Sequence, residues 1–205
     1  MRRLGVLVFA VLAAIAALAQ EYRFGTTTVS NSGLQGKVYL IRPGTDRLPN
    51  FDKMRPEGWV YTNSLNIWPQ SFSEGFPGVT SRNEWFGIDY SGKFWVEEGG
   101  EFRFSLLSDD GAKLWIDDKL VIDLDGTHIP TSSSSSAHLT RGVHRLRVAY
   151  FQGPQYVVAL VLAVAKPGGE WRIFHTDDFT PPKDPSAWVN GKIKDVKPLD
   201  NTPRN

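Results

Sequence analysis

Short runs of apolar and aromatic residues alternate with turn-forming residues over most of the chain. Between Val38 and Phe174 the runs are separated by clusters of Gly, Pro, Asn, Asp and Ser, and no apolar period of 3.6 residues persists for three turns. This pattern is typical of strands joined by turns. The sequence therefore predicts an all-β fold, an antiparallel β-sandwich or barrel.

Three segments carry the strongest strand signals. Residues 101–107 (EFRFSLL) and 143–151 (VHRLRVAYF) alternate apolar with polar positions, the period of a strand that has one face in water. Residues 156–165 (YVVALVLAVA) are apolar at both alternating sets of positions. We predict that this last segment is a central strand, covered on both faces.

Aromatic residues are abundant, with seven Trp, twelve Phe and six Tyr. Each buries roughly 150–250 Å², so aromatic rings supply much of the predicted core. Trp68, Trp85 and Trp115 are possible platforms on which a sugar ring could stack. Because nothing in the sequence separates an exposed Trp from a core one, we expect burial for each.

Other segments show weak or no periodicity. Residues 43–76 are rich in turn formers and predict long loops, and the serine tract of residues 131–136 predicts a surface loop. After Phe174 the chain becomes polar and rich in proline, which indicates a loosely held tail.

The first residues, MRRLGVLVFAVLAAIAALA, resemble a secretory signal that is cleaved after Ala19. The apolar run is shorter than the roughly 20 residues of a membrane span, although a retained anchor is the alternative. The predicted organisation is a signal peptide (1–19), an N-terminal segment (20–33), a β domain (34–174) and a tail (175–205). We expect a secreted, periplasmic or cell-surface protein with no stable membrane span after cleavage.

The charge and cysteine content narrow the class of partner. Loss of Arg2 and Arg3 with the signal leaves 21 of the 23 basic residues against 22 acidic ones, so no basic field for nucleic acid remains. The chain has no cysteine, which argues against a small disulfide scaffold. We expect no nucleic-acid partner.

Residues 104–126 (FSLLSDDGAKLWIDDKLVIDLDG) carry acidic residues at three corners. The simplest interpretation is a three-stranded meander whose turns are formed by Asp109–Asp110, Asp117–Asp118 and the segment 123–126. A turn needs only one Asp, however. The alternative is a site for a hard cation such as Ca²⁺, which takes six to eight oxygen ligands.

An EF-hand loop does not fit this segment. With Gly126 at the sixth position, the first would be Val121 and the twelfth Ser132, so the acidic ends are missing. Asp109 and Asp110 are better candidates. Successive side chains of an extended chain point to opposite faces, so the backbone between these two must bend for both to reach one ion.

Two motifs carry a family resemblance. They are F-x-x-x-S-D-D-G-x-x-L-x-I-D-x-K-L-V-I-D-x-D-G-x-H, which starts at Phe104, and L-x-x-G-x-H-x-x-R-V-x-Y, which starts at Leu139. The sequence resembles the PA14 domain, a β-barrel module of bacterial toxins, glycosidases, adhesins and yeast flocculins. The resemblance covers roughly residues 34–174.

This resemblance implies a binding site. In sugar-binding members a cis peptide joins the Asp pair, and both carboxylates hold one Ca²⁺ that binds vicinal hydroxyls of a sugar. By motif match the Ca²⁺ ligands here are Asp109 and Asp110, with Gln152 from the loop after the late strand in a position where an Asn is common. Gln155, Asp125 and His128 are further candidates for ligand contact, and the last two have hydrogen bonding within a turn as their alternative.

Signals for catalysis are lacking in the sequence. The four His show no paired metal spacing, no G-x-S-x-G motif occurs, and Glu97 and Glu98 precede a Gly-Gly turn. We expect no enzyme. The predicted function is an exported carbohydrate-binding module that binds a glycan or polysaccharide with Ca²⁺. The alternative is a structural module of the cell envelope that binds other envelope proteins without metal or sugar.

Overall fold

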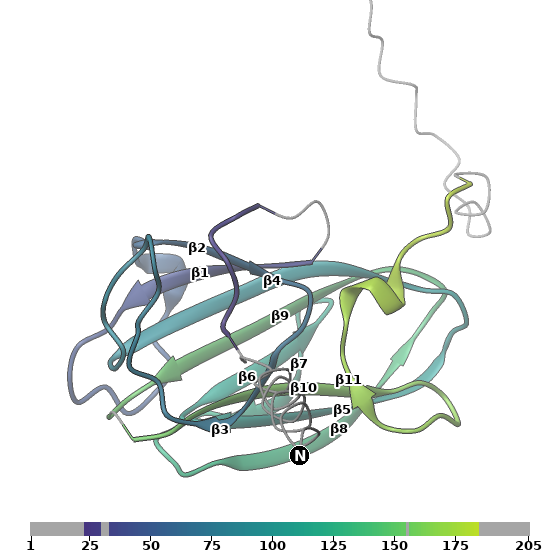
Figure 1. Cartoon of the computed structure of the whole chain (residues 1–205). Helices are drawn as coiled ribbons and strands as arrows, with labels where there is room; N and C mark the ends of the chain where they lie inside the picture. The colour runs from purple at the N-terminus through teal and green to yellow at the C-terminus, as the bar shows by residue number, and fades with distance from the viewer. Residues whose placement is uncertain (1–22, 30–32, 155, 185–205) are drawn as a thin grey trace, which may run out of the picture.

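Two antiparallel sheets pack face to face around one apolar core (Figure 1). The computed structural model describes residues 23–29, 33–154 and 156–184. Nearly all its regular structure is strand, and the only helical elements in these ranges are two short 3-10 turns. The predicted antiparallel β-sandwich is confirmed.

The first sheet has six strands in the order β2-β1-β4-β9-β6-β7. Its centre is the pairing of β4 with β9, which runs from Phe86 opposite Gln152 to Val96 opposite Gly142. The strands are β1 (Leu34–Leu40), β2 (Gly58–Thr62), β4 (Phe86–Val96), β6 (Ala112–Ile116), β7 (Lys119–Leu124) and β9 (Gly142–Gln152).

The second sheet has the order β11-β10-β5-β8, and β3 pairs with the same edge of β10 as β11 does. β3 lies along the first half of β10 and β11 along the second half. The strands are β3 (Asn66–Gln70), β5 (Gly100–Asp109), β8 (Thr131–Leu139), β10 (Val158–Ala165) and β11 (Arg172–Ile173).

Strand alternation fills the core from both sheets. Phe102, Phe104 and Leu106 of β5 are at most 2% exposed, as the period-two pattern of this segment predicts. At one end of the core, rings pack edge to face, for example Phe76 and Phe86 with centroids 4.9 Å apart.

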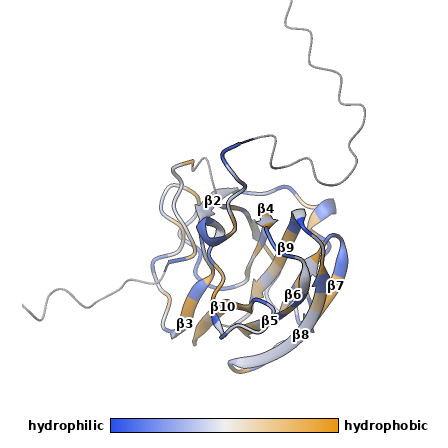
Figure 2. Cartoon of the chain, turned by 90° about the vertical axis from the view of Figure 1, so that its right-hand side faces the viewer, coloured by the Kyte–Doolittle hydropathy of each residue, from blue (hydrophilic) through white to orange (hydrophobic). Residues whose placement is uncertain are grey.

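Two predicted loops contain strands. Residues 43–76 hold β2 and β3, and the serine tract lies in β8, an edge strand that pairs with β5 from Gly100 to Ser108. In Figure 2 this strand is pale whereas β10 is largely orange. The loop predictions were wrong because the backbone of a strand pairs through its N–H and C=O groups, which serine supplies as well as valine does.

The predicted three-stranded meander is wrong. β5 pairs with β10 and β8, whereas β6 pairs with β7 and β9 in the other sheet. Only the β6–β7 hairpin is as predicted, and Asp117 (φ 49°) and Asp118 (φ 65°) at its turn adopt left-handed conformations. The chain thus crosses from one sheet to the other at Asp109–Gly111, because a period of two does not say which sheet a strand joins.

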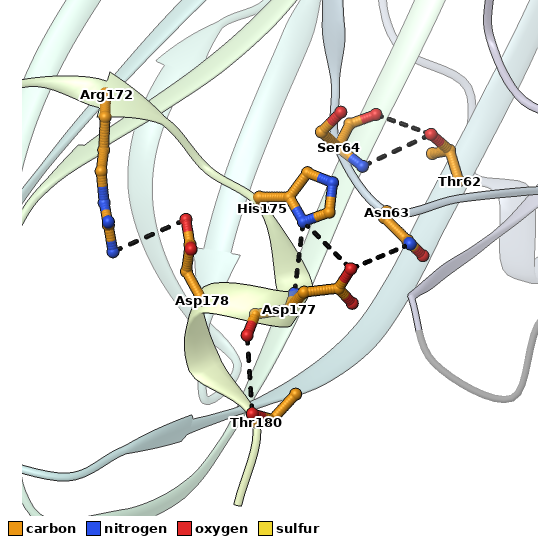
Figure 3. Close-up of polar contacts among 8 residues, drawn as sticks. All are labelled: Thr62, Asn63, Ser64, Arg172, His175, Asp177, Asp178 and Thr180. Atoms are coloured by element: carbon orange, nitrogen blue, oxygen red, sulfur yellow. Dashed lines mark hydrogen bonds and ion pairs between the residues drawn. The ribbon is translucent and has the colours of Figure 1, made fainter.

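The packed body extends beyond Phe174. Phe179, in the 3-10 turn η2 (Thr176–Phe179), is 4% exposed and its ring stacks on that of Phe174 at 5.0 Å. The backbone N–H of Thr176 donates to the carbonyl of Asn63 at 2.9 Å, and nearby polar contacts hold this segment beside the turn between β2 and β3 (Figure 3). Residues 176–179 are therefore part of the packed body, so the expectation of a loose tail was wrong for them.

The predicted signal peptide (1–19) and residues 185–205 of the predicted tail lie outside the described residues. Within residues 23–29, 33–154 and 156–184, no helix has the length and apolar character that a membrane crossing requires.

Candidate functional site: an acidic corner between the sheets

Asp109 and Asp110 form the corner at which the chain leaves β5 for β6. The peptide between them is cis, as the family resemblance implies. Both residues are buried, with 8% and 4% of their surfaces exposed. Two adjacent buried carboxyl groups are uncommon in a protein interior, because removing a carboxylate from water is costly unless it is paired or hydrogen-bonded.

The carboxylate of Asp110 is held by backbone amides from two loops. The N–H of Gly153 donates to its Oδ2 at 2.7 Å, and the N–H of His128 donates to its Oδ1 at 3.0 Å. These bonds join the corner to the segment after β7 and to the loop after β9. The side chain is therefore fixed in one orientation.

Asp109 is held through its backbone. The hydroxyl of Tyr150 donates to the carbonyl oxygen of Asp109 at 2.6 Å and also lies 2.5 Å from Oε1 of Gln152. The Nε2 of Gln152 donates to the carbonyls of Pro154 and Val157 at 3.1 and 3.0 Å. Tyr150 and Gln152, both fully inside the protein, thus connect the acidic corner to the β9–β10 loop.

Burial and the neighbouring charge raise the pKa of Asp109 to about 6, because a desolvated carboxylate beside Asp110 is harder to ionise. His128 and the amide of Gln152 act in the opposite direction on this pKa. Burial also raises the pKa of Asp110, although the two backbone N–H donors oppose that rise. A cation at this corner would relieve the repulsion between the two groups.

The donor set suits a hard cation in part. Asp109 and Asp110 offer carboxylate oxygens, and Gln152 offers its amide oxygen Oε1, which lies 2.5 Å from the Tyr150 hydroxyl. Among the described residues no group of three or more Asp, Glu, His or Cys side chains could hold a metal ion. A complete Ca²⁺ shell therefore needs carbonyl, water or sugar oxygens in addition to the two carboxylates.

Asp125 and His128 lie beside this corner and have protein partners. Oδ1 of Asp125 accepts from the N–H of Leu48 at 2.7 Å, and its Oδ2 pairs with Lys113 at 3.2 Å. The ring nitrogens of His128 lie 2.9 Å from the carbonyls of Leu124 and Ile129. These contacts agree with the hydrogen-bonding alternative for both residues, and the ligand role stays a prediction. Gln155 lies outside the described residues.

The second acidic corner has a different environment. Asp117 pairs with His144, with 2.6 Å between Oδ2 and Nδ1, and its Oδ1 accepts from the N–H of Arg145 at 2.8 Å. His144 also contacts the carbonyl of Thr140 at 2.8 Å, so it is a satisfied structural histidine. These contacts tie the β6–β7 turn to β9.

Sequence reasoning did not identify two residues that shape the acidic corner. Gly153 follows Gln152 in the loop after β9, and its N–H holds Asp110. Tyr150 lies in the alternating segment 143–151, and its hydroxyl lies between the Asp109 carbonyl and the Gln152 amide oxygen. A buried Tyr needs a hydrogen-bond partner, and this is the signal from which the role of Tyr150 could have been found.

This architecture was compared with those of known proteins. A sequence model described as "PA14 domain" matches residues 69–177. No curated protein sequence matches the chain significantly.

Several solved structures are similar to the chain. A PA14 sugar-binding domain from an RTX adhesin has a TM-score of 0.60 at 17% identity, over 72% of this chain and 97% of that one. The PA14 domain of an antifreeze protein has a TM-score of 0.59 at 18% identity, over 73% and 92%. An anti-sigma factor domain-containing protein has a TM-score of 0.58 at 20% identity, over 75% of this chain, which spans 49% of that protein.

At these identities the structural likeness establishes the fold. The sequence model, in turn, covers more than half of the 205 residues and includes the acidic corner. The chain belongs to the PA14 domain family.

Proposed function

We propose that this protein is an exported, non-catalytic carbohydrate-binding module that binds its glycan through Ca²⁺ at the Asp109–Asp110 corner. The observation that carries the proposal is the pair of adjacent buried carboxyl groups, one of them fixed by two backbone amides. Membership of the PA14 family and likeness to a domain described as sugar-binding support it.

The residues of the corner have separable roles in this proposal. Asp109 and Asp110 hold the cation, and Gln152 contributes its amide oxygen. When bound, Ca²⁺ supplies a centre that accepts hydroxyl oxygens of a sugar. Gly153 and His128 hold Asp110 in position through their N–H groups, and Tyr150 holds the backbone of Asp109. Binding needs no proton transfer or covalent step.

Calcium titration followed by a glycan titration tests the proposal. Ca²⁺ at about 100 times its dissociation constant should stabilise the native protein by about 2.7 kcal/mol, and chelator should reverse the effect. Asp109→Asn and Asp110→Asn should lose both the stabilisation and the calorimetric heat of glycan binding. Asp46→Asn, a change at an exposed site, is the matched control.

Two results would contradict this function. The first is a melting temperature that Ca²⁺ does not change. The second is glycan binding that persists unchanged in both Asp variants and in chelator, because the cation would then have no part in recognition.

A further inference from the structure

The outer face of the second sheet carries a shallow trough of about 530 Å³. Trp68 of β3 and Trp171, the residue before β11, flank it and keep 48% and 41% of their surfaces exposed. The exposure of Trp68 corrects the expectation that it is buried. The lining of the trough also includes Ser105 and Leu107 (β5), Ser132 (β8), and Val161 and Ala163 (β10).

Strand alternation places these residues on the outside. Leu160 and Leu162 of β10 point into the core, so Val161 and Ala163, which alternate with them, face outward. This arrangement explains why β10 is apolar at both sets of positions. It is central in its sheet, as predicted, but its second face forms the floor of the trough instead of a second core.

The trough is nearly uncharged. Arg172 is the single charged residue of its lining, and its guanidinium pairs with Asp178 at 3.6 Å (Figure 3). The flanking indoles offer flat apolar surfaces, and β5 and β8 offer serine hydroxyls. A neutral polysaccharide has the complementary surface, because the C–H face of a pyranose ring packs on an indole while hydroxyls at its edge form hydrogen bonds.

One wall of the trough is held in position by stacking. The guanidinium of Arg103 lies 4.9 Å from the centroid of the Trp171 ring and donates to the carbonyl of Gly169 at 3.2 Å. A ring that is already held loses little side-chain freedom when a ligand stacks on it. Trp171 is therefore prepared to bind before the ligand arrives.

One end of the trough lies near the acidic corner along β10. Asp109 pairs with Ala159 of β10, and the register of β10 with β3 places Trp68 beside Ala159. Three neighbouring strands thus put Trp68 roughly 10 Å from Asp109. Trp171 lies about six residues further along β10, roughly 20 Å from Trp68, which is the length of several sugar rings.

We propose that this trough is an extended subsite for a neutral polysaccharide, which runs from the Asp109–Asp110 corner over Trp68 to Trp171. The proposal rests on the function proposed above for the sugar residue that Ca²⁺ holds at the corner. Along the trough itself binding is by stacking and hydrogen bonding and needs no cation. The ligand class is therefore an internal stretch of a polymer, in place of a single terminal sugar.

Affinity electrophoresis of the full chain tests this proposal in gels that contain hydroxyethylcellulose, xylan or galactomannan. Trp68→Ala and Trp171→Ala should each lower the affinity for the retarding polymer about tenfold. Trp59→Ala is the matched control, because Trp59 is 46% exposed but lies on β2 of the other sheet. Trp68→Phe keeps a ring and should retain part of the affinity, which separates stacking from a loss of fold.

The outcomes distinguish the two proposals. Equal retardation of the Trp68, Trp171 and Trp59 variants would overturn the trough, and a Ca²⁺-dependent heat of glycan binding in calorimetry would still support the corner. Retardation that depends on both tryptophans but persists in chelator and in Asp109→Asn supports the trough and contradicts the role of Ca²⁺. Retardation in none of the three neutral gels, or in an alginate gel alone, would overturn the trough.

Discussion

The backbone N–H of Gly153 donates to Oδ2 of Asp110 with 2.7 Å between the two atoms. This bond joins the corner between β5 and β6 to the loop after β9, since Gly153 follows Asp110 by 43 residues. It also leaves no room for a side chain, since a Cβ on Gly153 would lie 2.9 Å from the same oxygen. The glycine is thus the packing partner of the carboxylate that we propose as a Ca²⁺ ligand.

Gly153→Ala should therefore weaken Ca²⁺ binding more than it weakens the fold. The added methyl group must displace the Asp110 carboxylate, with a loss of about 1 kcal/mol from the strained hydrogen bond. We expect a Ca²⁺ affinity reduced about tenfold in calorimetry. Gly169→Ala, whose added Cβ would make a tight 3.3 Å contact with the Lys166 carbonyl oxygen outside the acidic corner, is the control. An unchanged Ca²⁺ affinity in Gly153→Ala would separate Asp110 from the ion.

The raised pKa of Asp109 makes stability without metal depend on pH. The folded-state pKa of about 6 lies above the usual carboxyl value, so the folded protein binds more protons than the unfolded chain between about pH 4 and pH 6. The cost of burying this charge is present above pH 6 and disappears below pH 4. Its contribution therefore lowers the free energy of unfolding as pH rises, by at most about 3 kcal/mol.

Asp109→Asn should remove that dependence. In chelator at pH 7 the variant should be more stable than the parent protein, and at pH 4.5 the difference should shrink because the parent is then protonated at Asp109. Urea unfolding at the two pH values measures it. A variant that is equally or less stable than the parent at pH 7 would show that the carboxylate is well solvated without metal.

The sequence predicted the fold class and the acidic corner but not the sheet to which each strand belongs. Alternation in residues 101–107 identified β5 correctly, because apolar residues at every second position indicate a strand with one buried face. The same period holds whether β6 pairs with β5 or with β9, so the crossing at Asp109–Gly111 was missed. That crossing is the feature that places Asp109 and Asp110 between two sheets.

The partners of the corner were also beyond sequence reasoning. Asp110 is bonded by backbone N–H groups of Gly153 and His128, and every residue except proline has such a group. No pattern of side chains could therefore identify them. The exposure of Trp68 was missed for a related reason, because it depends on β3 joining the edge of β10.

Asp125 gives a test of ligand contact against a structural role. Its carboxylate accepts from the N–H of Leu48 and pairs with Lys113, and its side chain is 14% exposed. Asp125→Ala would leave that N–H without its partner, so we expect a loss of about 1–3 kcal/mol in unfolding free energy. Ca²⁺ and glycan affinities, measured by calorimetry on the folded variant, should stay within about twofold of the parent values. Reduced glycan affinity with unchanged stability would instead indicate ligand contact.

Ser108 lies one residue before the acidic pair and points to the opposite face. It is fully buried, and its Oγ has no hydrogen-bond partner among the described residues. A buried hydroxyl without a partner lowers stability, so Ser108→Ala should leave the unfolding free energy unchanged or raise it by about 1 kcal/mol. Ca²⁺ affinity should not change, because alternation directs Ser108 into the core with Leu106 and away from Asp109. Urea unfolding with and without Ca²⁺ measures both. A loss of stability that appears only with Ca²⁺ would mean that this hydroxyl supports the ion, and the corner would then extend into the core.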